Sequence, residues 1–439
     1  MGTRPEVYML RAARFLPFAL LALNAAIASA EDTLAARAAR AEARVIETRR
    51  DIHQHPELGF LEKRTAALVA KRLRSLGIRV REGVGQTGVV GVLSGGKPGR
   101  IVALRADMDA LPVVEQTGLP FASTARSTYN GQEVGVMHAC GHDSHVAMLL
   151  GAAEVLAGMR EELPGSVVFL FQPAEEGGGP AETGGAEAML ADGAFDDPRP
   201  DAVFGLHVGA EDVAGEMSVV SGPAMAAADR FRILVKGRQT HGAMPWAGVD
   251  PIAVAARIVL AIEALPGREI DVTTPAIVTV GAIHGGVRNN IIPEQVELIG
   301  TIRTLEEGAR SALHAKIERT AVHTAEASGA SAEVEIVRGY GVLTNDPALT
   351  AWGRGVLERS FGKDKVHSGR PATTAEDFSY FANRVPGMFV WLGVRDPRTP
   401  LAQAAPNHSP RFLVDESALT TGVRALAELA LAFNAAGSE

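Results

Sequence analysis

The chain has 439 residues, enough for two domains, and its 46 % apolar and 21 % charged residues are ordinary for a globular protein. The formal net charge is −8, and neither a basic block nor an internal repeat is present, which argues against nucleic-acid binding and against a repeat array. The single cysteine, Cys140, excludes a disulfide within the chain.

The first 30 residues have the pattern of a secretory signal peptide. Arginines precede the apolar run FLPFALLALNAAIA, and the small residues Ala28-Ser29-Ala30 precede the acidic pair ED. The other interpretation is a membrane anchor, but this run contains Asn24 and is shorter than the roughly 20 residues that span a bilayer. We therefore expect cleavage after Ala30 and an exported chain, periplasmic or secreted, with no membrane span.

Apolar strands alternate with helical patterns through most of residues 31–439. Two helices are expected between Leu34 and Leu76, with a break at Pro56 and Gly59. The alternation predicts an α/β domain whose mostly parallel sheet is covered by helices on both faces. The expected strands are 88–95, 100–109, 166–176, 201–209 and 387–394, and the expected helices are 144–159 and a closing helix from residue 416.

The middle of the chain has a different order of elements. Strands are expected at 229–238, 276–286, 295–305 and 331–340, and helices at 250–265 and 306–329. This β-α-β-β-α-β order is that of a ferredoxin-like α+β unit. We therefore expect a catalytic domain in two parts, 31–224 and 341–439, with a small domain, 225–340, inserted between them.

Polar side chains follow the apolar strands at the edge where open α/β sheets bind ligands. Thiolate, imidazole and carboxylate groups from five segments predict a transition-metal centre. Each group alone has a simpler explanation: a core histidine, a small buried cysteine or a solvated acidic turn. The residues are Asp107, Asp109, His138, Cys140, His142, Glu175, Glu176, His207 and His408.

The motifs that contain these residues resemble the amidohydrolase branch of the dinuclear metalloexopeptidases. That branch includes hippurate hydrolase, N-acyl-amino-acid amidohydrolases and hydrolases of indoleacetic acid–amino acid conjugates. The resemblance implies a zinc-exopeptidase-like catalytic domain with an inserted lid and dimerisation domain. The motifs, in family order along nearly all of residues 31–439, are RRDIHQHPELGFLE, ALRADMDALPV, MHACGHDSH, FQPAEEGGGP, GLHV, HGAMPWAGVDP, NNIIPE, TTAEDFSYF and PNHSP.

The resemblance also implies roles for individual residues. Two divalent ions, which could be Zn, Mn, Ni or Co, are expected at Cys140, His142, Glu176, His207 and His408. Binding of a metal by the lone thiol would protect it from oxidation. Glu175 is implied as the general base, and Asp109 as the acid that orients a metal ligand.

One position departs from the wider superfamily. A metal-binding histidine of the pattern His-x-Asp-x-x-Pro is replaced by Asp107, whose role stays open. We expect His138 and His145 to support the site without binding metal, and His53 and His55 to have structural roles.

The inserted domain carries further candidates. The resemblance implies that His241 supports the oxyanion, often from the partner subunit of a homodimer. Asn290 and Arg288 could hold the free carboxylate of a substrate, since the guanidinium fork suits that group. The alternative for these two is a turn stabilised by asparagine with a solvated arginine.

The sequence thus predicts an exported, metal-dependent amidohydrolase that cleaves N-acyl amino acids. A carboxypeptidase or dipeptidase acting on short peptides is the second hypothesis, because it would use the same core. A metal-binding or ligand-binding protein without catalysis is the third, and the presence of both Glu175 and Glu176 argues against it.

Overall fold

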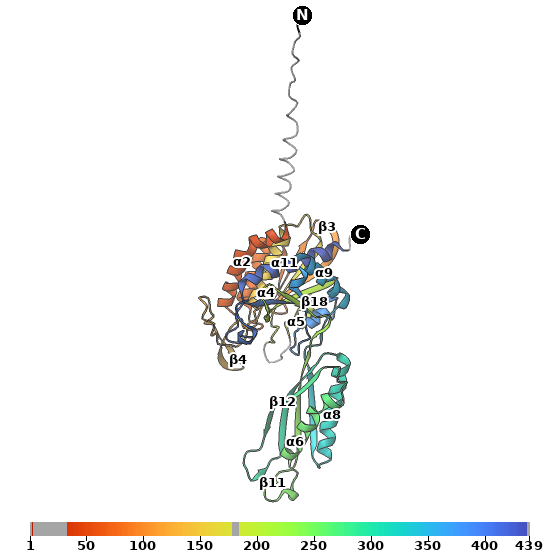
Figure 1. The fold of residues 1–439 in the computed structure, drawn as a ribbon. Coiled ribbons are helices and arrows are strands. Elements are labelled where there is room, and N and C mark those ends of the chain that lie inside the picture. Colours follow the sequence, from red (N-terminus) through yellow and green to blue (C-terminus); the bar gives the residue numbers. More distant parts are fainter. Residues whose placement is uncertain (1, 3–32, 178–183, 437–439) are drawn as a thin grey trace.

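The computed structural model describes residue 2 and residues 33–177 and 184–436, so the predicted signal peptide lies outside the described residues. The described chain forms a large lobe and an elongated small lobe that extends from it (Figure 1). Within residues 33–177 and 184–436, no helix is both long enough and apolar enough to cross a membrane.

An eight-stranded sheet in the order β1-β2-β6-β3-β7-β18-β8-β17 forms the centre of the large lobe. Its middle strands β6, β3, β7 and β18 are mutually parallel, whereas β1 and β2 are antiparallel to their neighbours. The predicted α/β class is therefore confirmed. The strands are β1 (Arg79–Val84), β2 (Gly88–Ser94), β3 (Lys97–Asp107), β6 (Pro164–Gln172), β7 (Ala202–Val213), β8 (Met217–Val219), β17 (Val366–Ser368) and β18 (Gly387–Arg395).

Helices cover both faces of this sheet. Successive side chains of a strand point to opposite faces, and on β3 the side chains of Val102 and Leu104 join one apolar cluster while Ala103 joins the other. The first cluster packs against α2 (Leu34–Gln54), α3 (Lys63–Ser75), α4 (His142–Ala157), α9 (Pro347–Phe361) and α11 (Leu419–Ala435). The second packs against α5 (Gly185–Ala191) and α10 (Phe378–Ala382).

Three predicted element ends were wrong in ways that matter for the site. β6 ends at Gln172 rather than at Glu176, because Pro173 has no N–H with which to continue the ladder, so Glu175 and Glu176 lie in a turn. β3 ends at Asp107, two residues before Asp109. α4 begins at His142 rather than at Ser144, directly after Gly141, whose φ of 95° suits glycine.

The small lobe has the predicted β-α-β-β-α-β order. Its strands pair antiparallel in the order β12-β14-β10-β15, and two helices pack on one face to enclose a separate apolar core. The predicted boundaries, 225 and 340, bracket these strands. The elements are β10 (Ala227–Lys236), α6 (Pro251–Glu263), β12 (Ala276–Gly285), β14 (Gln295–Thr304), α8 (Glu307–Glu326) and β15 (Ser331–Arg338).

Several short elements were not predicted. A two-stranded ribbon, β11 (Thr240–His241) with β13 (Ile291–Ile292), lies at the tip of the small lobe, at its far end from the large sheet (Figure 1). Strands of two to four residues carry too little apolar periodicity to be recognised in a sequence. The remaining short elements are β4 (Arg126–Tyr129), β5 (Gln132–Gly135), β9 (Gly222–Met225), α7 (Leu265–Arg268) and β16 (Leu343–Asn345).

Candidate metal centre

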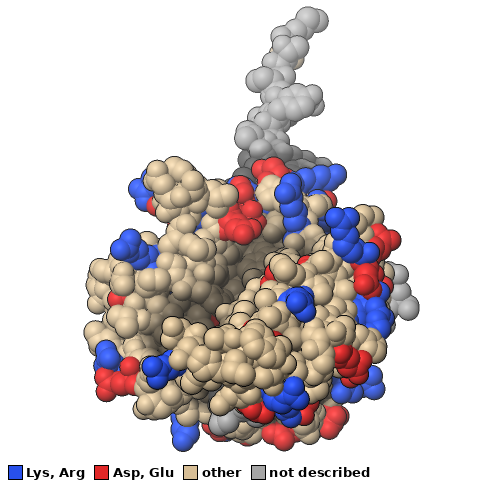
Figure 2. Space-filling model, turned by 90° about the horizontal axis from the view of Figure 1, so that it is seen from below, with Lys and Arg blue, Asp and Glu red and all other residues tan. Residues whose placement is uncertain are grey.

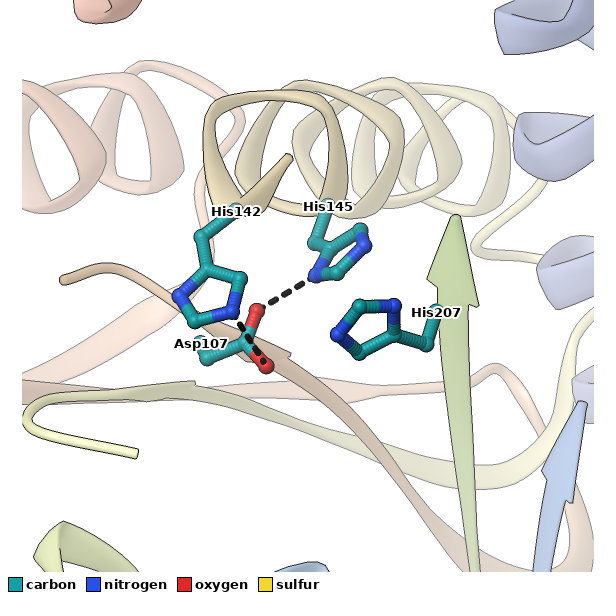
Figure 3. Close-up of side chains that lie close together, drawn as sticks. All are labelled: Asp107, His142, His145 and His207. Atoms are coloured by element: carbon teal, nitrogen blue, oxygen red, sulfur yellow. Dashed lines mark hydrogen bonds and ion pairs between the residues drawn. The ribbon is translucent and has the colours of Figure 1, made fainter. Parts of the chain in front are cut away.

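Four buried side chains meet where β3 ends and α4 begins (Figure 3). Asp107 is the last residue of β3, and His207 comes from β7. His142 and His145 lie three residues apart on α4, so they share one face of that helix. One ligand atom from each of the four lies within 4.8 Å of the others.

Two of these histidines each have one ring nitrogen fixed by a hydrogen bond and the other available. His142 Nδ1 donates to Asp109 Oδ1 at 3.1 Å, and His142 Nε2 is buried without a hydrogen-bond partner among the described residues. His207 Nδ1 donates to the Val208 carbonyl oxygen at 2.8 Å, and His207 Nε2 lies 3.5 Å from Cys140 Sγ. This arrangement is typical of metal-binding histidine, so the side chains fit a divalent ion.

His145 differs because both of its nitrogens are occupied. Nδ1 donates to Asp107 Oδ1 at 2.5 Å, and Nε2 accepts from the Val208 N–H at 2.9 Å. The other oxygen of Asp107 accepts from Arg105 at 2.7 Å. Burial alone would raise the pKa of Asp107, but Arg105, His142 and His145 together hold it well below its usual value. His145 therefore orients Asp107, which agrees with a supporting role.

A second group joins the remaining predicted ligands. Cys140, His142 and Glu176 have ligand atoms within 4.8 Å of one another. His408 Nε2 lies 2.9 Å from Glu176 Oε1, and hydrogen bonds with Cys140 and Glu176 raise the pKa of His408 to about 10. The structure thus brings all five predicted ligands together, and their binding of ions stays a prediction.

The loop that carries His408 is tied to the same strand ends. The His408 N–H donates to the Ala139 carbonyl oxygen at 2.8 Å. The Asn407 side-chain amide donates to the carbonyl oxygens of Cys140 and Val208, both at 3.0 Å. These bonds place the His408 side chain beside the cysteine loop.

Glu175 lies next to both groups without belonging to the predicted ligands. Its Oε2 is 4.0 Å from His142 Nε2, and its carboxylate clusters with those of Asp107 and Glu376. Burial, followed by the negative charges of Glu376 and Glu176, raises the pKa of Glu175 well above its usual value. A carboxyl group in this setting retains a proton that it has accepted, as the acid step of hydrolysis requires.

Asp109 serves two predicted ligands at once. Its Oδ1 accepts from His142, and its Oδ2 accepts from the Glu176 N–H at 2.9 Å. The geometry agrees with the orienting role that the motif implied for Asp109.

The charged residues beneath the site were not predicted to have a role. Arg105 is fully buried and binds Glu376 at 2.9 Å and Asp377 at 3.2 Å. Gln172 also binds the Arg105 side chain, at 2.7 Å. Two features of the sequence could have indicated this buried charge cluster. One is an arginine in an otherwise apolar strand, and the other is the Glu-Asp pair of TTAEDFSYF.

Three predicted residues of the small lobe lie near one another but apart from the predicted metal ligands of the same chain. His241 faces Ile291 across the ribbon, and the Gly242 N–H donates to the Asn290 carbonyl oxygen at 2.8 Å. Arg288 lies in the turn before β13, and all three predicted side chains are exposed. Figure 1 places this tip at the end of the small lobe away from the large sheet.

The other three histidines named in the sequence motifs differ in whether their ring nitrogens have hydrogen-bond partners. His53 is buried between Asp143, at 2.9 Å, and Glu115, at 3.2 Å, which agrees with a structural role. His55 is exposed and bonds the Asp51 carbonyl oxygen at 2.8 Å. His138 is buried, and neither of its ring nitrogens has a hydrogen-bond partner within the described chain.

Comparison with known proteins shows the family. The model of peptidase family M20/M25/M40 matches residues 103–432, more than half of the chain. The chain belongs to this family. The resemblance seen in the motifs is thereby confirmed, and the protein is a metal-dependent hydrolase of amide bonds.

Individual relatives cover nearly the same length. Thermostable carboxypeptidase 1 of Saccharolobus solfataricus is 41 % identical over 89 % of this chain and 95 % of its own. N-acetyl-L-cysteine deacetylase of Bacillus subtilis is 37 % identical over 86 % and 85 %. The solved structure of a dinuclear metal-binding peptidase of the M20 family from Bacillus subtilis is 34 % identical, covers 90 % of this chain and 98 % of its own, and has a TM-score of 0.76.

Replacing Asp109 by alanine should weaken metal binding about 10–100-fold, the usual effect of removing a group that orients a ligand. Both His142 and Glu176 would lose an oriented hydrogen bond. Titration calorimetry with Zn²⁺ or Mn²⁺ measures the affinity. Asp201→Ala is the control, because Asp201 accepts the Ile101 N–H at the opposite edge of the sheet. Equal affinities of the Asp109 variant and the unmodified protein would remove Asp109 from the site.

Proposed function

We propose that the protein hydrolyses the amide bond of N-acyl amino acids and that Glu175 is its general base. The observation that carries this proposal is the position of Glu175. It is a buried carboxylate whose Oε2 lies 4.0 Å from Nε2 of the predicted ligand His142, and it is not needed to complete the set of predicted ligands. A catalytic carboxylate with a raised pKa beside a metal-ligand cluster is the arrangement expected of a metal-dependent hydrolase.

The predicted ligands would hold two divalent ions, whose contribution when bound is Lewis-acid polarisation of the scissile carbonyl. Glu175 takes a proton from the attacking water as the oxygen–carbon bond forms. It then delivers that proton to the leaving nitrogen as the carbon–nitrogen bond breaks. Its peptide carbonyl oxygen accepts from the Tyr340 hydroxyl at 2.7 Å, which fixes the direction of the side chain.

The substrate class follows from what the relatives have in common. A deacetylase of N-acetylcysteine and a carboxypeptidase both cleave an amide whose nitrogen belongs to an amino acid with a free carboxylate. Figure 2 shows a hollow beside the small lobe, and side chains other than Lys, Arg, Asp and Glu form most of its walls. A wall with few of these charged side chains suits a neutral acyl group, which supports an N-acyl amino acid.

The second candidate is a carboxypeptidase or dipeptidase that acts on short peptides. The 41 % identity with a protein named thermostable carboxypeptidase favours it. The two hypotheses differ only in whether the acyl group is a simple acid or a peptide. They share the metal ligands and Glu175.

We also propose a homodimer formed through the small lobe. β12 is an edge strand, and apolar side chains beside it are exposed: Ile283 on β12, Val287 at 94 % and Leu260 on α6 at 75 %. An open edge with apolar neighbours favours pairing with a second copy. Because the tip lies away from its own metal ligands, His241 would act at the site of the partner subunit, where Arg288 and Asn290 could hold the substrate carboxylate.

We propose that the protein is exported. The support is the order of charged, apolar and small residues in the first 30 positions. Protein recovered from outside the cytoplasm should begin at Glu31 when its N-terminus is sequenced. Recovery only from the cytoplasm, with an N-terminus at Met1, would contradict export.

Glu175→Gln should keep the fold and the metal content but lower turnover about 10²–10⁴-fold, the range for one acid–base group. The substrates are a panel of N-acetyl, N-benzoyl and N-peptidyl amino acids, with release of the free amino acid as the signal. Glu133→Gln, in the exposed β4–β5 hairpin, is the matched control. Turnover near the wild-type level at full metal occupancy would place the base elsewhere, and release from none of the panel by the unmodified protein would refute the proposed substrate class.

His241→Ala should lower kcat about 10²–10³-fold, the cost of one oxyanion donor, without changing the metal content. Mixing inactive Glu175→Gln and His241→Ala subunits should restore part of the activity, because one site of each mixed dimer is intact. Native mass spectrometry confirms that mixed dimers form. Mixed dimers that stay inactive would exclude action across the dimer, and an active His241→Ala protein would exclude the catalytic role.

A further inference from the structure

The turn that presents Glu175 and Glu176 is held by side chains from three distant segments. Each of three consecutive residues has one backbone group bound in this way. The contacts are Ala174 N–H to the Glu62 carboxylate at 2.8 Å, Glu175 carbonyl oxygen to the Tyr340 hydroxyl at 2.7 Å, and Glu176 N–H to Asp109 Oδ2 at 2.9 Å.

The first contact falls on a strained residue. Ala174 has a φ of 46°, in the left-handed region that residues other than glycine rarely occupy. Such a conformation persists only where the surrounding structure holds it. The Ala174 carbonyl oxygen accepts from the Gly185 N–H at 3.0 Å, and the Ala174 N–H is held by Glu62. The direction of the following side chain therefore depends on these two contacts.

Glu62 reaches the turn from the segment between α2 and α3. Its side chain is fully buried, and its second oxygen accepts from the Thr87 hydroxyl at 2.5 Å. The same segment touches the turn again at Gly59, where an added Cβ would lie 2.5 Å from the Gly177 carbonyl oxygen. Direct backbone packing at Gly59 and the hydrogen bond that Glu62 accepts from Ala174 therefore hold one segment against the turn.

Capping of α3 does not account for Glu62. Although Glu62 precedes the first residue of that helix, its side chain makes no capping hydrogen bond. Glu57 does this instead, accepting from the Arg64 N–H and the Thr65 N–H, both at 2.9 Å. Two carboxylates five positions apart therefore have different roles. Glu57 caps helix α3, and Glu62 binds the turn that presents Glu175.

We propose that Glu62 is a positioning residue for the reaction: by holding the Ala174 amide, it fixes the direction in which Glu175 and Glu176 leave the turn. This inference rests on the proposed role of Glu175. Misplacement of a catalytic group by about 1 Å lowers the rate by a factor on the order of 10². Loss of the hydrogen bond between Glu62 and the Ala174 N–H should therefore lower the rate measurably.

Glutamine is the conservative replacement at this position. Burial, followed by the nearby charge of Asp109, raises the pKa of Glu62 to about 8, so the side chain holds a proton over much of the neutral range. A glutamine carbonyl oxygen can accept from the Ala174 N–H in the same way. Methionine has a similar length but offers no comparable acceptor.

The experiment compares three variants of the full-length, metal-loaded protein. Glu62→Met should lower kcat about 10²-fold with KM unchanged, and the amides of residues 174–177 should exchange with deuterium faster. Glu62→Gln should restore kcat and slow exchange. Glu57→Met should lower the melting temperature by the loss of a cap, without changing kcat or exchange in the turn.

The proposal would be overturned by a Glu62→Met protein with wild-type kcat, by a Glu62→Gln protein as impaired as Glu62→Met, or by unchanged exchange in the turn. Parallel losses of kcat in Glu62→Met and Glu57→Met would also overturn it, because they would reduce the effect to stability. The exchange measurement needs no substrate. It therefore still tests the hold on Ala174 if the proposed hydrolytic function fails.

Discussion

The architecture of the large lobe depends on binding three carboxylates that are buried beneath the candidate metal centre. Arg105 does this from within β3, binding Asp107 at 2.7 Å, Glu376 at 2.9 Å and Asp377 at 3.2 Å, and all four side chains are nearly inaccessible to solvent. A buried carboxylate without a partner is costly, and removing one member of such a group leaves the others uncompensated. Arg105 also joins the two parts of the chain that the small lobe separates, because Glu376 and Asp377 follow that lobe.

Above this layer, the three histidines among the candidate ligands are each positioned by a second residue. Asp109 orients His142, the Val208 carbonyl oxygen orients His207, and Asn407 ties the His408 loop to the cysteine loop. The result is a set of nitrogen, sulfur and oxygen atoms that face one another before any ion binds. Such pre-arranged ligands reduce the reorganisation needed on binding.

The class of the fold and the position of the site could be predicted from the sequence because both follow from local patterns, whereas the choice of five ligands came from the family resemblance and stays a prediction. Apolar runs followed by polar residues marked the strand ends, and thiolate, imidazole and carboxylate residues at those ends marked the site. The role of Arg105 could not be predicted, since two of its partners, Glu376 and Asp377, lie about 270 residues away and only the fold brings them together. The left-handed conformation of Ala174 could not be predicted either, because alanine has no preference for that conformation. His241, Arg288 and Asn290 were assigned by resemblance alone, and the placement of their lobe depends on its connections to the large sheet.

The most direct test of the account is a crystal structure of the metal-loaded protein with anomalous scattering recorded at the absorption edge of the added metal. The account predicts two ion peaks, with Cys140 Sγ, His142 Nε2 and His207 Nε2 about 2.0–2.3 Å from an ion, and with Glu176 and His408 completing the set. A single ion held by Asp107 and His145, with Cys140 unbound, would contradict it, as would the absence of any ion at this edge of the sheet.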